Sequence, residues 1–297
     1  MRLPLLSRWM PKLHKADSPA FAFPSALEAP SAIAVVVGTE PGDIWAGLLL
    51  MNNLIRHYAC AEITAVVPEE ELDLLNLLPR LPLASPYGRD RIAVGERWKG
   101  CAGDGSVAFC VSSGRAASGL LQRTGARVRV SAVRTASANL EVRLSPRPVP
   151  ETVHGMCEAL GISPDRSWKP VSLPDDSARA SEILAPVSGR SLPYIAADGG
   201  MLRVMRRFGA EIPLRVVQVS GRESAVASEG RAVRAAVTAG ASAVLADTRG
   251  LWAEAGAFGV PVVGLDRRGS FPDWGREPAR SASDLSAQWT TLLRQGW

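Results

Sequence analysis

Apolar residues along the chain gather in short runs and in helical periodicity, and these two patterns follow one another. The clearest case is residues 33–69, which read as a buried strand, a glycine-acid turn, a helix and a second strand ending at Pro68. Short apolar runs bounded by Gly or Pro predict strands, and a 3.6-residue period predicts a helix. The segment therefore predicts a βαβ unit, with Asp43 where the first strand meets its helix.

The same alternation continues to the end of the chain. An irregular stretch rich in Pro and Gly covers residues 78–105, and a helix that starts at Val149 is expected to stop near Gly161. Further strands are expected at 106–111, 127–133, 193–197, 214–219, 243–246 and 260–265. Further helices are expected at 115–123, 176–184, 201–208, 225–239, 251–258 and 283–294. Strands alternating with helices predict an α/β fold with parallel sheets.

The length of 297 residues suits two domains. We expect an N-terminal extension at 1–31, a first domain at 32–163, a linker at 164–176 and a second domain at 177–297. Three prolines between 163 and 176 favour the linker. The last helix, with Leu285, Trp289, Leu292 and Leu293 on one face, is expected to pack back on the first domain.

Composition narrows the ligand classes. The chain is 46% apolar and 21% charged, which is enough for packed cores, and its net charge is +5 with far more Arg than Lys. Mild basicity suits phosphate-bearing ligands or an anionic membrane surface. No basic run with interleaved aromatic residues is present, so nucleic acid is not an expected partner. The four cysteines lack CxxC spacing and the three histidines lack metal-ligand spacing, so neither a metal nor another cofactor is expected.

The start of the chain bears on location. No convincing signal peptide and no apolar run of about 18 residues is found, which favours a cytoplasmic protein. Trp9, Met10 and Leu13 beside basic residues would allow peripheral contact with the inner membrane, although Pro4 and Pro11 limit any helix there and favour a flexible arm.

Asp43 is the first candidate for chemistry. In an open α/β sheet, ligands bind outside the carboxyl ends of the strands, so a carboxylate there can act as a base. The alternative is structural, because Asp is a favoured N-cap for the helix that follows.

A second candidate segment, 243–266, has a strand that runs into Asp247-Thr248-Arg249-Gly250 before a helix rich in small residues. Amide groups at a helix start form an anion site, to which the Thr248 hydroxyl adds a donor. Arg115 follows a strand end in the first half and would meet an anionic acceptor, although a simple helix-start loop explains it as well.

These two segments resemble the heptosyltransferase family of bacteria, the ADP-heptose:lipopolysaccharide transferases of glycosyltransferase family nine. Gly42-Asp43 matches the family's Gly-Asp turn, and Asp247, Thr248, Gly250, Gly259 and Pro261 match its nucleotide-sugar motif with Arg249 as an extra residue. The resemblance implies two Rossmann-like domains facing a cleft, the GT-B arrangement.

The chain departs from the family in its second half. The motif's histidine has no counterpart, a Lys-x-Trp-Pro stretch is missing, and the region 222–246 is short. Gly199-Gly200, which open a helix, would cradle a phosphate instead, and Arg203, Arg206 or Arg207 would supply the lost cation.

The function that the resemblance implies is transfer of a sugar, a heptose in this family, from a nucleotide-diphosphate sugar to a lipopolysaccharide-type or other glycan or glycolipid acceptor. The reaction would invert the anomeric centre without a metal, with Asp43 as the base. A competing hypothesis is a noncatalytic scaffold or binding subunit that recognises a protein partner, which the missing motifs favour. A third is another cleft enzyme, such as a sugar epimerase.

Overall fold

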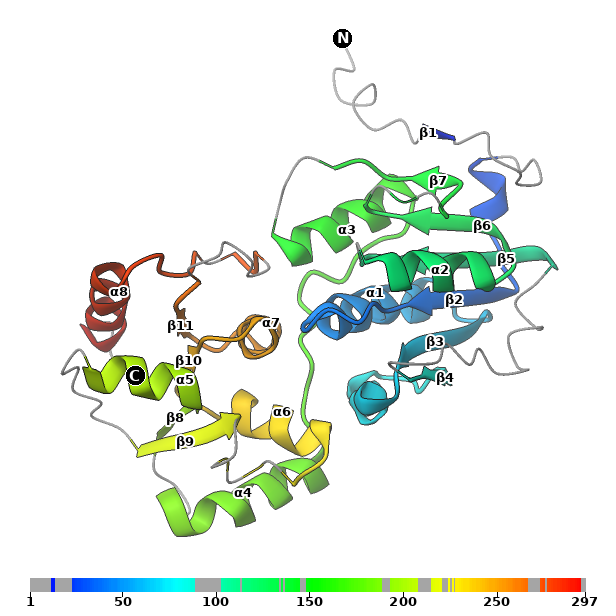
Figure 1. Ribbon diagram of the computed structural model, residues 1–297. Coiled ribbons are helices and arrows are strands. Elements are labelled where there is room, and N and C mark those ends of the chain that lie inside the picture. The colour runs from blue at the N-terminus through cyan, green and yellow to red at the C-terminus, as the bar shows by residue number, and fades with distance from the viewer. Residues whose placement is uncertain are drawn as a thin grey trace. The chain divides into compact units, whose positions relative to one another are not determined.

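The computed structural model describes residues 12–13, 23–88, 103–112, 114–133, 135, 137–144, 148–188, 193–207, 215–220, 224, 226, 228–266, 273–275 and 277–294. The chain divides into two compact units, Met1–Trp168 and Lys169–Trp297. Figure 1 shows that each unit is a sheet with helices packed on it. None of the helices in the described ranges is both long and apolar enough to span a membrane.

The first unit has a seven-stranded sheet in the order β1-β7-β6-β5-β2-β3-β4. All neighbouring strands are parallel except β1, which pairs antiparallel with β7. The strands are β1 (Lys12–Leu13), β2 (Ala32–Val36), β3 (Glu62–Pro68), β4 (Leu83–Tyr87), β5 (Gly103–Cys110), β6 (Ala126–Ser131) and β7 (Leu140–Glu141). The predicted opening βαβ unit is confirmed, because β2 and β3 are parallel neighbours joined by α1 (Asp43–His57).

Helices cover the first sheet. Helix α2 (Arg115–Arg123) buries Ala117, Leu120 and Leu121 against the face that Ala34 and Val36 of β2 share. Side chains alternate between the faces of a strand, so Ile33 and Val35, both fully buried, belong to the other face. Helices α1 and α3 (Val149–Ala159) contact each other, and two 3₁₀ helices, η2 (Ser25–Leu27) and η3 (Glu69–Leu77), complete the unit.

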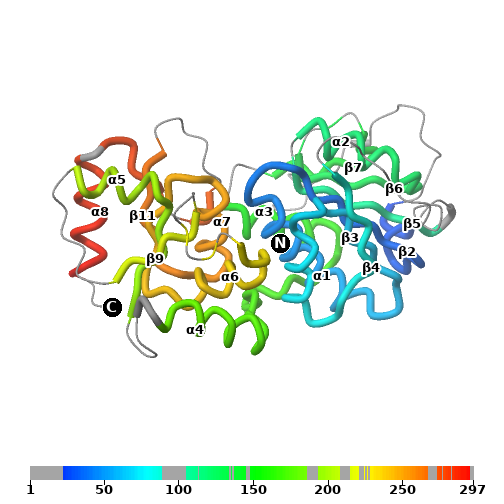
Figure 2. The backbone as a smooth tube through the Cα atoms, turned by 60° about the horizontal axis from the view of Figure 1, so that its bottom comes forward, coloured from blue at the N-terminus to red at the C-terminus, as the bar shows by residue number. Residues whose placement is uncertain are grey.

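The second unit has a four-stranded parallel sheet in the order β11-β10-β8-β9. Its strands are β8 (Tyr194–Asp198), β9 (Arg215–Ser220), β10 (Ala243–Ala246) and β11 (Val262–Gly264). Its helices are α4 (Pro174–Ser188), α5 (Gly199–Arg207), α6 (Arg231–Ala239), α7 (Arg249–Phe258) and α8 (Ala282–Arg294). The tube in Figure 2 gives a second view of these elements, with α4 and α6 close together.

The helices of the second unit cover both faces of its sheet. On one face, Ala196, Val244 and Ala246 pack with residues of α4, α6 and α7, among them the fully buried Trp252. On the other face, Ile195 and Leu245 pack with residues of α5 and α8. Helix α8 therefore buries Leu285 and Trp289 in the core of its own unit. Its expected packing on the first domain concerns the arrangement of the two units and stays a prediction, as do the predicted domain boundaries.

Two differences from the sequence-based expectations have a local cause. Strand β4 lies in the stretch 78–105, which was expected to be irregular. The sequence does not predict this strand because Ser85 is buried while Leu83 is exposed, so its residues lack an apolar pattern. Helix α6 begins at Arg231, six residues after the expected start, since Gly230 has extended backbone angles and stands just before the helix.

The buried face of α1 gives a stability prediction. Leu50 is fully buried, whereas Leu81 is 64% exposed. We expect Leu50→Ala to lower the free energy of unfolding by about 2–5 kcal/mol, because it removes apolar contact and leaves a cavity. The matched change Leu81→Ala should alter it by no more than about 0.5 kcal/mol. Urea denaturation of both variants measures the difference, and equal effects would contradict the described packing.

Candidate functional site

Asp43 lies at the carboxyl end of the first sheet. The helix α1 begins with Asp43, and the residue before it, Gly42, adopts a left-handed φ of 98°. Glycine takes this conformation without steric cost, so Gly42 rather than Asp43 makes the turn into the helix. The alternative of Asp43 as an N-cap is thus replaced by a position in the first turn, where a carboxylate interacts favourably with the helix dipole.

The Asp43 carboxylate sits close to the adjoining ends of β2 and β5. The amide of Gly38 donates to the Ser112 hydroxyl oxygen at 2.9 Å, which joins the segments after these two strands. A Cβ on Gly38 would lie 2.7 Å from that of Ser112 and would collide with the Asp43 carboxylate. Strand β2 lies between β3 and β5: the chain continues from β2 to β3 on one side, and β5 is the neighbour on the other side. The carboxyl end of β2 is therefore a topological switch point of the sheet.

Two further groups lie at this edge of the first unit. The hydroxyl of Tyr87, the last residue of β4, donates to the Val37 carbonyl at 2.7 Å. Burial raises the pKa of Tyr87, and the charge of Asp43 adds to that shift. Arg115, the expected acceptor-binding residue, is exposed at the first position of α2, which follows β5. The structure thus places Asp43 and Arg115 at the same sheet edge.

In the second unit, Asp198 lies at the carboxyl edge of the sheet. It is the last residue of β8, and it is 1% exposed. Its Oδ2 accepts hydrogen bonds from the Asp247 amide at 3.0 Å and from the Thr248 amide and hydroxyl at 3.0 and 2.8 Å. Its Oδ1 accepts a hydrogen bond from the Ser220 hydroxyl. One carboxylate therefore ties together the carboxyl ends of β8, β9 and β10.

This arrangement changes the expected anion site. The Thr248 amide and hydroxyl, which were expected to serve a phosphate, donate to Asp198, and the Thr248 hydroxyl oxygen also caps α7 by accepting from the Leu251 amide at 3.4 Å. At the start of α7, Gly250 and Leu251 line a cavity.

A second carboxylate, that of Asp247, lies over the start of α5. A Cβ on Gly200 would collide with it, so glycine is required at that position. Burial raises the pKa of Asp247 to about 6, and the charge of Asp198 adds to the rise, whereas Arg203 lowers it. Four of the expected donor-binding residues, Gly199, Gly200, Arg203 and Asp247, are thus brought together, but with a carboxylate where the phosphate was expected.

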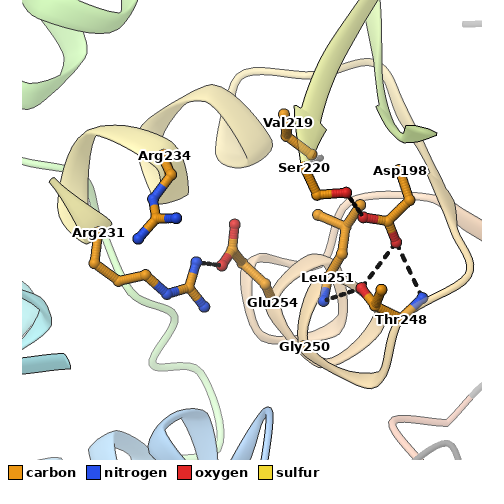
Figure 3. A pocket seen from close by; sticks show the side chains of 9 residues that line it. All are labelled: Asp198, Val219, Ser220, Arg231, Arg234, Thr248, Gly250, Leu251 and Glu254. Carbon is orange, nitrogen blue, oxygen red and sulfur yellow. Dashed lines mark hydrogen bonds and ion pairs between the residues drawn. The ribbon is translucent and has the colours of Figure 1, made fainter. Parts of the chain in front are cut away.

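The cavity beside Asp198 has a volume of about 160 Å³ and is built by β8, β9, α6 and α7. Figure 3 shows Arg231 and Arg234 on the α6 side, Glu254 of α7 between them and Thr248, and Asp198 with Ser220 at the far end. Glu254 is 2% exposed and accepts from Arg231 and from the Thr238 hydroxyl, both at 2.5 Å.

Sequence reasoning missed the four charged residues that line this cavity: Asp198, Arg231, Arg234 and Glu254. Asp198 had a readable signal, since it stands at the end of a buried strand and directly precedes Gly199-Gly200. Arg231, Arg234 and Glu254 are on helices α6 and α7, and the sequence alone does not show which helix residues line a cavity. Arg249 is half-buried at the first position of α7, and Trp252 of the same helix is a core residue. Among the described residues, no group of three or more metal-ligating side chains occurs.

The Asp198–Asp247 pair predicts a measurable titration. We expect Asp198→Asn to lower the pKa of Asp247 toward the ordinary 3.8, because removing a like charge favours the ionised carboxyl. Burial, the larger cause, should hold it above that value. Carbon-13 NMR of the Asp247 carboxyl over a pH series measures the shift. Ser220→Ala keeps the charge of Asp198 and should leave the pKa raised; an unchanged pKa in Asp198→Asn would contradict the pairing.

The chain has solved structural neighbours. A glycosyltransferase of family 9 from Veillonella parvula has a TM-score of 0.61 at 15% identity, with 85% of each chain covered. The E. coli heptosyltransferase WaaC, solved with ADP-2-deoxy-2-fluoro heptose, has a TM-score of 0.58 at 16% identity, with 90% of this chain and all of that one covered. E. coli ADP-heptose lipopolysaccharide heptosyltransferase II has a TM-score of 0.57 at 15% identity, covering 89% of this chain and 99% of that one.

In comparisons of sequence, no protein-family model and no curated protein matches the chain. At such low identity the structural matches establish the fold. The α/β fold of GT-B type that the sequence predicts is confirmed, and the chain resembles in structure the heptosyltransferases of glycosyltransferase family 9.

Proposed function

We propose that the chain is a glycosyltransferase that moves a sugar from a nucleotide-diphosphate sugar to a glycan or glycolipid acceptor. The observation that carries the proposal is that each unit presents polar side chains at the carboxyl edge of its parallel sheet, on a fold shared with solved glycosyltransferases. Asp43 stands at that edge of the first unit, and the polar cavity opens beside Asp198 in the second.

The second unit is the donor side of this proposal. A nucleotide-diphosphate sugar needs cations and helix-start amides for its phosphates and carboxylates or amides for its sugar hydroxyls. The carboxylate of Asp247 accepts hydrogen bonds from hydroxyls but repels phosphate, so the start of α5 at Gly199-Gly200 suits the sugar. The diphosphate is then directed to the α7 side, where Gly250 and the two arginines line the cavity.

The first unit supplies the base. In the proposed reaction, an acceptor hydroxyl oxygen attacks the anomeric carbon, the bond from that carbon to the diphosphate oxygen breaks, and Asp43 takes the hydroxyl proton. A single displacement of this kind inverts the anomeric centre and leaves a nucleoside diphosphate. The amides at the α7 start and nearby arginines stabilise the charge that develops on the diphosphate, so the step does not require a metal. Arg115, on the edge that carries Asp43, is proposed to bind an anionic group of the acceptor.

The identity of the sugar as a heptose, and of the acceptor as a lipopolysaccharide-type glycan, extends the proposal further. Its support is that WaaC and heptosyltransferase II, which share the fold, are both named as heptosyltransferases, and that the name of the second also includes lipopolysaccharide. We also propose that the chain acts in the cytoplasm, in peripheral contact with the inner membrane.

A noncatalytic scaffold is the second candidate, and one observation favours it. The Thr248 amide and hydroxyl donate hydrogen bonds to Asp198, whereas in the transferase they would be expected to bind a phosphate of the nucleotide sugar. In this case the second unit would serve as a binding surface for a protein partner and would bind no nucleotide sugar.

The role of Asp43 gives a direct test of the transferase. We expect Asp43→Asn to slow sugar transfer by about 10²–10⁴-fold, because a positioned general base contributes that much, while the affinity for the nucleotide sugar stays unchanged. The rate is measured as release of ADP from ADP-heptose in the presence of a lipopolysaccharide-core acceptor. Glu40→Gln removes an exposed carboxylate nearby in sequence and should transfer at the wild-type rate. A wild-type rate in Asp43→Asn would exclude Asp43 as the base.

A further inference from the structure

A single peptide group between β2 and α1 is held by two buried side chains. This peptide group joins Val37 to Gly38, directly after the end of β2. Its carbonyl oxygen, on Val37, accepts a hydrogen bond from the Tyr87 hydroxyl at 2.7 Å. Its amide, on Gly38, donates to the Ser112 hydroxyl oxygen at 2.9 Å. Because a peptide bond is planar, holding both of its polar groups fixes the orientation of the whole group.

The two side chains come from different parts of the sheet. Tyr87 is the last residue of β4, and Ser112 lies two residues after the end of β5. In the strand order β5-β2-β3-β4, these two strands lie on opposite sides of β2. Both side chains are buried, and a buried polar group that loses its partner is costly. The Val37–Gly38 peptide group is therefore clamped across the sheet by two bonds that the fold strongly favours.

The Asp43 carboxylate rests on this clamped group. A Cβ on Gly38 would collide with the Asp43 Oδ2 atom and would lie 2.7 Å from the Cβ of Ser112. Glycine thus lets the carboxylate approach the backbone more closely than any other residue would. A shift or rotation of the peptide group consequently moves the surface against which Asp43 packs.

The clamp keeps its chemical form at neutral pH. A tyrosine donates its hydroxyl proton only while it is protonated, and burial raises the pKa of Tyr87, with the charge of Asp43 adding most to the remaining shift. The charges of Glu70 and Glu71 and of Cys110 act in the same direction. Tyr87 therefore remains a donor throughout the range in which Asp43 is ionised as a base.

We infer that Tyr87 and Ser112 are positioning residues for Asp43, which set the direction of its carboxylate by clamping the Val37–Gly38 peptide group. The inference rests on the proposed function, in which Asp43 is the base, and adds two residues that do not need to touch a substrate. A misplacement of about 1 Å in a reacting group can cost about 10²-fold in rate. Groups that hold the support of a base are thus part of what makes it effective.

The test removes each hydrogen bond of the clamp separately, by Tyr87→Phe and by Ser112→Ala. We expect each variant to lower kcat for transfer from ADP-heptose to a lipopolysaccharide-core acceptor by about 10- to 100-fold, with both KM values unchanged. The double variant should lose less than the product of the two effects, because both bonds act on one peptide group. Ser112→Thr keeps a hydroxyl acceptor and should restore most of the rate.

Two matched controls lose the same kind of bond elsewhere in the first unit. The buried Tyr58 hydroxyl donates to the Leu27 carbonyl at 2.7 Å, and the Ser106 hydroxyl oxygen accepts from the Arg127 amide at 3.3 Å. Tyr58→Phe and Ser106→Ala should transfer at the wild-type rate. A purely structural effect of a lost buried hydrogen bond would instead lower kcat in the controls as well, and that result would overturn the inference.

Carbon-13 NMR of the Asp43 carboxyl gives a readout that does not depend on activity. Its resonance should shift in Tyr87→Phe and in Ser112→Ala and stay in place in both controls. If the folded clamp variants have the wild-type kcat and an unshifted resonance, the positioning role is wrong and the proposed function stands. If the wild type transfers no sugar, the proposed function fails, and the resonance alone decides: a shift in both variants supports the clamp, and its absence overturns it.

Discussion

The carboxylate of Asp198 is the interaction on which the second unit's polar edge depends. It is almost fully buried and accepts hydrogen bonds from Ser220, Asp247 and Thr248, so a single side chain joins the carboxyl ends of three strands. Hydrogen bonds to a charged group are among the stronger ones in proteins, and such networks give a site a defined geometry. The cap of α7 by Thr248 and the place of Asp247 over α5 both follow from it.

This constraint divides the edge into two regions of different charge. On the α5 side, Asp247 stands above Gly200 with a pKa raised to about 6 by burial and by Asp198, so a negative charge is present there at neutral pH. On the α6 and α7 side, two arginines face the first turn of a helix. A nucleotide-diphosphate sugar has the same division between hydroxyl-rich sugar and anionic diphosphate, and the proposed orientation of the donor rests on that correspondence.

The fold was largely predictable from sequence, because strong local patterns specify its elements. The helix at 115–123 and the strand at 243–246 match α2 and β10, and the first βαβ unit follows from one apolar strand and one Gly-Asp turn. The site was less predictable. Asp43, Asp247 and Gly200 were found from strand ends, but the contacts of Asp198 and the pairing of Glu254 with Arg231 join residues 22 to 50 positions apart. No local periodicity encodes such contacts, so the donors of Thr248 were assigned to a phosphate when a carboxylate of the chain itself uses them.

The most direct test of this account is hydrogen–deuterium exchange of the full chain with and without ADP-, GDP- and UDP-sugars. The account predicts that one nucleotide class slows amide exchange in two segments, at the β8–α5 junction around Asp198 to Gly200 and at the β10–α7 junction around Asp247 to Leu251. Slower exchange there would place the donor at the edge that Asp198 organises. Unchanged exchange at both junctions with every nucleotide sugar would contradict the proposed donor site.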